Sequence, residues 1–361
     1  MVDLDALEAA GIKDAHDRAP LLDYLDSLGF TAEEMIAAEL EGRLFGLAGD
    51  ALMRSGRPQY SLHDAARHLA LPIEEVEHAW AVLGLTATSS EAVLLTQADL
   101  DGLKTWAEMR ALIGSEAALG SLRVIGSSLA RIAEAGSSAM RASVPDIQLN
   151  YAPDELTTAQ TFRAVASYVP RIAALMDAAY RHHLSSARLY FEGVVQDASA
   201  SVVSGVGFVD LSGFTSLTQQ LQPDELSLLL NEFSSTVTDV VHADGGRIVK
   251  FIGDAVMWVS STPHALVKAA LDLVDHPKAV DAGLQVRGGI AYGSMIAANG
   301  DFFGNPVNLA ARLVAAAEPG QILASAGVHE ALPLWPAEEL EPLTLKGFDS
   351  PQPAFLLGHK R

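Results

Sequence analysis

Three short segments of the sequence carry the residue types that phosphate chemistry requires. In the first, Val209–Thr215, an apolar run ends at Asp210, two residues before the pair Ser212-Gly213. In the second, Arg247–Met257, the pattern of a hairpin puts Asp254 at its tip. Two carboxylates on neighbouring strands suit Mg²⁺, which takes one or two protein carboxylates and otherwise keeps water and phosphate oxygens. Taken singly, an aspartate at the end of a strand is more simply explained as a turn residue that accepts backbone hydrogen bonds.

The third segment, Asp301–Arg312, ends in a helical pattern that begins near Pro306. Asn308 and Arg312 are four residues apart, so an amide and a guanidinium lie on the same face of that helix. One such pair is common on protein surfaces. We interpret the three segments, in this order on one chain, as parts of one site.

In these segments the sequence resembles the class III nucleotidyl cyclase family, from about residue 200 to the C-terminus. The resemblance implies two metal-binding aspartates, an adenine-recognising pair, a transition-state pair and a triphosphate-binding lysine: Asp210 and Asp254, Lys250 and Asp301, Asn308 and Arg312, and Lys346. An active adenylyl cyclase carries the same residue at all of these positions. The resemblance therefore implies conversion of ATP to cyclic AMP and pyrophosphate, with two Mg²⁺ or Mn²⁺ ions per site.

The same resemblance implies a homodimer. In the family, the metal aspartates come from one subunit, and the residues that contact adenine, ribose and the α-phosphate come from the other. A chain with one catalytic domain would then form two equivalent sites across a two-fold axis.

The expected base is adenine for a reason of hydrogen bonding. Adenine offers an acceptor at N1 and a donor at N6, which suit a lysine at position 250 and a carboxylate at position 301. Guanine presents the reverse pattern and would leave both side chains unpaired, which is costly in a buried site. We therefore expect ATP rather than GTP as the substrate.

The composition of the chain argues against several other functional classes. The 361 residues predict two domains, and the net charge of −21 disfavours nucleic acid or an anionic membrane as a main partner. The chain has no cysteine, which excludes disulfides and a cysteine nucleophile and is typical of a cytoplasmic protein. No apolar run approaches the ~18 residues of a transmembrane segment. Walker and dinucleotide-binding motifs do not occur.

The periodicity of apolar residues changes near residue 200. Before it, helical spacing predicts an all-helical regulatory domain over residues 1–191, followed by a connector over 192–203. After it, strands alternate with helices in the order β-α-β-β-α-β, which predicts a ferredoxin-like cyclase domain over 204–361. The expected fold class is α+β. The expected strands are Gly205–Val209, Arg247–Ile252, Ala255–Ser260, Leu284–Ala291 and Ser294–Ala298.

Residues 61–84 have the pattern of a helix-turn-helix, which raises DNA binding as an alternative function. The second helix would begin Pro-Ile-Glu-Glu-Val-Glu, and this acidic first turn would repel phosphate. An αα-hairpin packed in a bundle is the preferred interpretation. A second alternative is a nucleotide-binding signalling module that has the cyclase fold but no turnover.

The arrangement as a whole resembles bacterial adenylyl cyclases with a helical, autoinhibitory and pH-sensitive N-terminal domain. Imidazole titrates near neutrality, and six histidines lie in this half, at positions 16, 63, 68, 78, 182 and 183. His182 and His183, just before the expected connector, are best placed to act on the catalytic domain. The resemblance also allows a fatty acid between the helices of the N-terminal domain.

Overall fold

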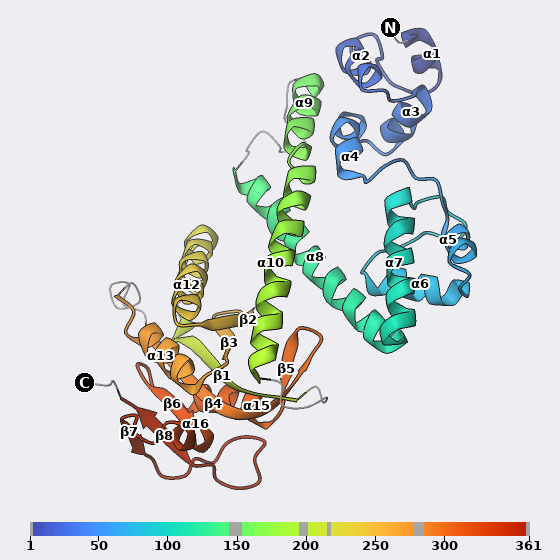
Figure 1. Ribbon diagram of the computed structural model, residues 1–361. Coiled ribbons are helices and arrows are strands. Elements are labelled where there is room, and N and C mark those ends of the chain that lie inside the picture. Colours follow the sequence, from blue (N-terminus) through green and yellow to red (C-terminus); the bar gives the residue numbers. More distant parts are fainter. Residues whose placement is uncertain (1–2, 144–153, 195–200, 215–217, 278–284, 359–361) are drawn as a thin grey trace. The chain divides into compact units, whose positions relative to one another are not determined.

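The computed structural model describes residues 3–143, 154–194, 201–214, 218–277 and 285–358. The chain divides into two compact units, Met1–His182 and His183–Arg361 (Figure 1). Among the described residues, no helix has both the length and the apolar composition needed to cross a bilayer.

The N-terminal unit is helical. Its elements are α1 (Leu4–Ala9), α2 (Ala19–Ser27), α3 (Ala32–Leu40), the short 3₁₀ helix η1 (Leu44–Gly46), α4 (Leu47–Met53), α5 (Leu62–Leu69), α6 (Ile73–Val82), α7 (Gln97–Ile113), α8 (Ser115–Ser143), α9 (Glu155–Ala166) and α10 (Val169–Val194). The last of these continues past the division between the units. It also extends beyond residue 191, where the sequence suggested that the connector begins.

Capping residues explain where several of these helices begin. The expected capping box at the start of α3 is present, because Thr31 accepts a hydrogen bond from the backbone of Glu34 and Glu34 accepts one from the backbone of Thr31. Ser61 and Thr96 form the same reciprocal arrangement at α5 and α7. Each such cap stabilises its helix by about 1 kcal/mol. The sequence therefore fixes three helix starts by local chemistry.

The second unit contains one mixed sheet with helices on both faces. Its elements are β1 (Ser201–Ser212), α12 (Pro223–Ala243), β2 (Gly246–Ile252), β3 (Ala255–Ser260), α13 (Pro263–Val274), β4 (Gln285–Ala298), β5 (Asp301–Phe303), α15 (Asn305–Ala316), β6 (Ile322–Ser325), α16 (Ala326–Ala331), β7 (Ala337–Glu339) and β8 (Ala354–Leu357). The strand order is β2-β3-β1-β4-β6-β8-β7, and β5 pairs with β4. The first six elements confirm the predicted β-α-β-β-α-β order.

Strand β1 lies between β3 and β4 and separates two hydrophobic clusters. Neighbouring residues of a strand point to opposite faces: Val209 is buried with side chains of α12 and α13, whereas Phe208 is buried with side chains of α15. The two faces of β1 are therefore covered by different helices, and its end is left to carry Asp210.

Two predicted strand boundaries differ from the structure. The sequence suggested two strands on either side of Tyr292 and Gly293, but β4 is continuous from Gln285 to Ala298. β1 begins at Ser201, four residues before the expected Gly205. Both strands are longer than expected because they pair with each other throughout, from Ser201 opposite Ile296 to Ser212 opposite Gln285. This pairing satisfies backbone groups that local sequence patterns assign to a turn.

Candidate active site

Asp210 lies near the end of β1 and is directly opposite Arg287 of β4. The guanidinium of Arg287 donates two hydrogen bonds to the carboxylate, from Nε to Oδ1 at 2.7 Å and from Nη2 to Oδ2 at 3.1 Å. Its third nitrogen, Nη1, lies 3.4 Å from the carbonyl oxygen of Ala317, at the end of α15. Both side chains are partly buried, with 20% of Asp210 and 30% of Arg287 exposed. The first expected metal ligand is thus held by a two-pronged ion pair.

Asp254 lies in the turn between β2 and β3. The turn depends on Gly253, whose φ of +63° is in the left-handed region that glycine occupies without strain. Burial raises the pKa of Asp254, and the negative charge of Asp210 raises it further, while Arg287 acts in the opposite direction. The two aspartates are therefore close enough to repel each other, and the structure brings together the pair that the sequence proposed.

This pair of carboxylates fits a divalent cation. Both side chains offer hard oxygen ligands. Two negative charges that repel each other are also stabilised in their ionised form when a cation lies between them. The guanidinium of Arg287 is bound to Asp210 and only partly offsets the repulsion at Asp254. In the described part of the chain, no group of three or more His, Asp or Glu side chains is arranged to hold a metal. The residues that would hold one here are Asp210 and Asp254.

Lys250 and Asp301 form an ion pair between β2 and β5. Lys250 follows an irregularity in the pairing of β2 with β3, of the kind that redirects a side chain. Asp301 also accepts a hydrogen bond from the backbone of Phe302, at 2.8 Å, through its other oxygen. About a third of Lys250 and a quarter of Asp301 is exposed, at 35% and 25%. The two residues expected to recognise adenine therefore lie together, 51 positions apart in the sequence.

Asn308 and Arg312 lie one turn apart on α15, and both are exposed. Neither side chain has a hydrogen-bond or ion-pair partner within the described residues. The position of α15 depends on Gly289 of β4, because a Cβ at this glycine would overlap the backbone of Ala310 and Val314. The helix backbone thus lies directly on β4, and this contact fixes where the amide and the guanidinium are presented.

Lys346 is exposed in the loop between β7 and β8, next to the buried Leu345. Within the described residues it forms no ion pair or hydrogen bond with the other candidate residues. The other six candidate residues form three pairs: Asp210 with Asp254, Lys250 with Asp301, and Asn308 with Arg312. Among the described residues, no hydrogen bond or ion pair joins one of these pairs to another.

The sequence analysis did not select Arg287. A signal was available, because this arginine interrupts an apolar and glycine-rich strand, Val286-Arg287-Gly288-Gly289-Ile290. A charge at such a position needs a partner on the neighbouring strand. The register that places Asp210 opposite it is a property of the folded sheet.

Comparisons with known proteins agree with this architecture. The family model described as "Adenylate and Guanylate cyclase catalytic domain" matches residues 196–358. An uncharacterized protein of Mycobacterium tuberculosis is 61% identical over 99% of this chain and 94% of its own length. An adenylate cyclase of Streptomyces coelicolor is 29% identical, over 83% of this chain and 76% of its own. A pH-sensitive adenylate cyclase of M. tuberculosis is 26% identical, over 88% and 80%.

Among solved structures, the adenylyl cyclase CyaB from P. aeruginosa is similar to this chain, with 26% identity and a TM-score of 0.41. The match covers 45% of this chain and 97% of that one. The family match over residues 196–358 shows that this chain belongs to the class III nucleotidyl cyclase family. Its second unit contains an adenylate or guanylate cyclase catalytic domain, and such domains act on nucleotides, generally use divalent metal ions and typically dimerise.

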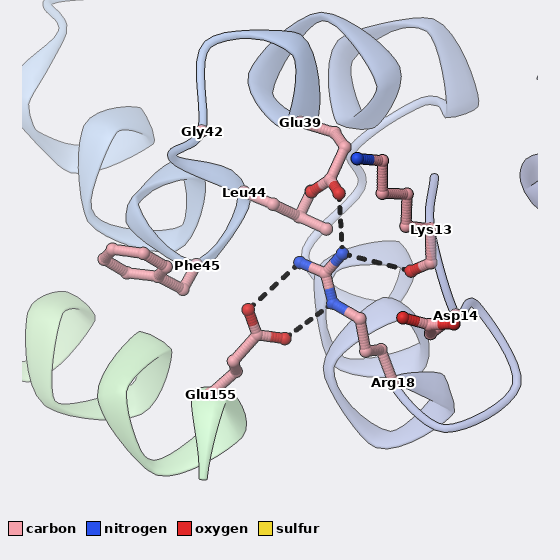
Figure 2. Close-up of a pocket in the computed structure, with 8 residues that line it drawn as sticks. All are labelled: Lys13, Asp14, Arg18, Glu39, Gly42, Leu44, Phe45 and Glu155. Carbon is pink, nitrogen blue, oxygen red and sulfur yellow. Dashed lines mark hydrogen bonds and ion pairs between the residues drawn. The ribbon is translucent and has the colours of Figure 1, made fainter. Parts of the chain in front are cut away.

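The N-terminal unit contains a cavity of about 370 Å³, shown in Figure 2. Its lining includes Lys13, Asp14, Arg18, Glu39 and Glu155, with Leu44 and Phe45 as its large apolar side chains. Charged groups of this kind do not suit an aliphatic chain. This pocket therefore does not support the fatty acid that the sequence analysis allowed in this domain.

The segment with the helix-turn-helix pattern forms α5 and α6. Val76, Ala79 and Trp80 of α6 are buried in a cluster that includes side chains of α7 and α8. Glu75, in the acidic first turn, forms an ion pair with Arg110 of α7. These contacts favour the interpretation as a packed αα-hairpin. His182 and His183 are both exposed on α10.

Proposed function

We propose that this protein is a cytoplasmic adenylate cyclase that converts ATP to 3′,5′-cyclic AMP and pyrophosphate as a homodimer. The observation that carries the proposal is the ion pair between Lys250 and Asp301, because a cationic donor and an acidic acceptor held side by side match the N1 and N6 edge of adenine. The approach of Asp210 and Asp254 supports it, as do relatives that carry the name adenylate cyclase.

In the proposed reaction, the ribose 3′-oxygen attacks the α-phosphorus while the bond to the β-phosphate breaks and pyrophosphate leaves. Asp210 and Asp254 would hold Mg²⁺ or Mn²⁺, two per site, which when bound lower the pKa of the 3′-hydroxyl and neutralise the phosphates. Arg312 stabilises the charge that develops on the α-phosphate, and Asn308 orients the ribose. Lys346 contacts the triphosphate.

Kinetics with the two purine nucleotides test the substrate assignment. We expect kcat/KM for ATP to exceed that for GTP. Replacing the pair by Lys250→Glu with Asp301→Cys should reduce turnover of ATP by about 10²-fold or more, roughly 3 kcal/mol of lost polar pairing. The same exchange at an exposed N-terminal pair, Arg43→Glu with Glu41→Cys, is the control and should leave the kinetics unchanged. Unchanged ATP kinetics in the first double variant would remove both residues from the base pocket.

The homodimer is supported by apolar side chains around the candidate residues. Phe251 and Ile252 follow Lys250 at the end of β2, and Ile296 and Phe303 are paired across β4 and β5, beside Asp301. Between 38% and 53% of each of these four side chains is exposed. Exposed apolar groups that cluster around polar ones are typical of an interface. We therefore place the contact between subunits at these strands.

Complementation between inactive variants tests the shared site. Asp210→Ala and Arg312→Ala should each abolish activity, and their co-expression should restore about one quarter of wild-type sites, because about half of randomly paired dimers are mixed and each mixed dimer has one intact site. Mixed dimers can be confirmed with two different tags. Activity no higher than that of the single variants would show that one chain supplies both residues.

We also propose that the helical domain, residues 1–191 before a connector at 192–203, regulates the catalytic domain by autoinhibition and responds to pH. Deletion of residues 1–195 should change activity several-fold, and His182→Ala with His183→Ala should flatten the response between about pH 5.5 and 8. A truncated protein with the rate and pH profile of the full chain would contradict this.

Two other outcomes would favour the alternative functions. Absence of cyclic AMP production would favour the silent nucleotide-binding module, and salt-sensitive binding of a DNA fragment would favour a regulator acting through residues 61–84.

A further inference from the structure

The contacts of Arg287 involve both oxygens of Asp210. Nε and Nη2 of the guanidinium donate to Oδ1 and Oδ2, respectively. A divalent cation that binds either oxygen would therefore share that oxygen with a hydrogen bond from a positively charged group. This geometry makes the guanidinium and the metal alternative partners of the same carboxylate, since two positive groups at the same oxygens repel each other.

A simpler interpretation is a cross-strand ion pair that only stabilises the sheet. Such pairs between partly exposed side chains contribute little to stability. This pair, however, lies near a second carboxylate, because the pairing of Val209 with Val256 brings the end of β1 beside the turn that carries Asp254, whose charge interacts with both Asp210 and Arg287. Without Arg287, two partly buried negative charges would face each other with no described cation bound to either. The guanidinium thus does at this place what a bound cation would do.

The guanidinium also has a second acceptor, besides the carboxylate of Asp210. The carbonyl oxygen of Ala317 lies 3.4 Å from Nη1, and Ala317 is the C-terminal cap of α15. The last carbonyls of a helix carry partial negative charge and attract cations. An acceptor other than Asp210 is therefore already within reach of Arg287 when a cation displaces it from the carboxylate.

We propose that Arg287 is a positioning residue that substitutes for the metal at Asp210. It neutralises the carboxylate and keeps the two aspartates together when no divalent cation is bound, and it moves off Asp210 when a cation binds. This inference rests on the proposed role of Asp210 as a metal ligand. Its consequence is that wild-type protein binds metal more weakly than its two carboxylates alone would allow.

Metal binding without nucleotide tests the inference in the full-length protein. The probe is Mn²⁺, with the free ion measured by electron paramagnetic resonance and the thermal midpoint measured with and without Mn²⁺. Arg287→Gln should bind Mn²⁺ about tenfold more tightly than wild type, because a unit positive charge has been removed from the site. It should also melt at a lower temperature without Mn²⁺ and gain more on its addition.

Three matched variants make the outcome decisive. Lys268→Gln also removes one positive charge from the same unit, but that charge is paired with Asp244 and Asp272, so Mn²⁺ affinity should be unchanged. Arg287→Lys keeps the charge but loses the two-pronged contact, and it should bind about threefold more tightly. Asp210→Asn should lose Mn²⁺ binding. If Asp210→Asn binds Mn²⁺ as wild type does, the proposed metal site fails. If Asp210→Asn loses Mn²⁺ binding while neither Arg287 variant binds Mn²⁺ more tightly than wild type, only the role of Arg287 is overturned. If Arg287→Gln does not fold, the Mn²⁺ affinity of Arg287→Lys tests that role.

Discussion

Arg18 in the N-terminal unit and Arg287 in the catalytic unit each lie between acidic or carbonyl oxygens, and the two arrangements differ in what surrounds them. In the N-terminal unit, Arg18 donates to both oxygens of Glu155, at 2.6 and 3.1 Å, and to Glu39 at 2.8 Å (Figure 2). In the catalytic unit, Arg287 donates to both oxygens of Asp210. Arg18 has two carboxylate partners, whereas Arg287 has one partner and a second carboxylate nearby. Each arrangement has one guanidinium and two carboxylates, but Arg18 donates to both of its carboxylates, whereas Arg287 donates to Asp210 and not to Asp254.

The pKa values of aspartates show the same contrast. In the N-terminal unit, hydrogen bonds from Ser61 and Arg67 lower the pKa of Asp64 to about 2, and the bond from Thr157 lowers that of Asp154. In the catalytic unit, burial raises the pKa of Asp254. Carboxylates that support folding are stabilised in their charged form, whereas the candidate metal ligand is charged at a cost. A raised carboxyl pKa next to a like charge is therefore a useful indicator of function.

The largest expected difference between the two units comes from replacing one carboxylate partner of each arginine by the corresponding amide. Asp210→Asn should lower cyclase activity by about 10²-fold or more, because one of the two proposed metal ligands is lost. Glu155→Gln, the matched change at Arg18, should leave kcat within about twofold and reduce the stability of the chain by about 1 to 2 kcal/mol. Steady-state kinetics and urea denaturation measure the two outcomes. Equal loss of activity in both variants would remove the distinction between the two arrangements.

The next largest expected effect comes from replacing a glycine in each unit by alanine. Gly289→Ala should reduce kcat about tenfold, because α15 must shift away from β4 and Arg312 shifts with it. Gly102, inside α7, has open space where a Cβ would lie, so Gly102→Ala should keep full activity and stabilise its helix by about 0.5 to 1 kcal/mol. Circular dichroism should confirm that both variants are folded. A fully active Gly289→Ala protein would show that the position of α15 is not critical.

The stability of an Asp254→Asn variant tests the cost of charge at the candidate metal site. At pH 7.5 and without divalent metal, we expect this variant to be at least as stable as wild type, because it removes a negative charge that the fold disfavours. Added Mn²⁺ should stabilise wild type and have little effect on the variant. Chemical denaturation at the two metal conditions gives both values. A clear loss of stability without metal would mean that Asp254 acts as a structural turn residue.

The smallest expected effect concerns Asp64 at the start of α5. Its pKa is lowered, so its charged form stabilises the folded chain. That contribution is present above the unfolded pKa near 4 and is lost as the pH falls through about 2. The difference in stability between wild type and Asp64→Asn should therefore be constant at neutral pH and decrease between about pH 4 and 2. Denaturation curves over this range measure it, and a difference that does not change with pH would exclude the charge as its source.

Much of the fold could be predicted because its signals are local. The capping box at Thr31 and the turn at Gly253–Asp254 depend on a few neighbouring residues, and both are present in the structure. The length of β4 could not be predicted, since it depends on pairing with β1, more than 70 positions earlier in the sequence. The same limit applies to the site. The candidate residues follow from short segments, whereas the ion pair of Arg287 follows from the register of two distant strands.

The pairing of β1 with β4 also determines how quickly the site can change. All twelve residues of β1 are paired with β4, and Asp210 and Arg287 are opposite each other within this ladder. Their main chains are therefore fixed, and amide hydrogen exchange at these positions should require opening of the sheet itself. An exchange of partners at Asp210 is left to the rotation of two partly buried side chains, and it requires none of the domain movements that take microseconds or longer. The site can therefore respond to a change in the concentration of free metal ion faster than the sheet opens.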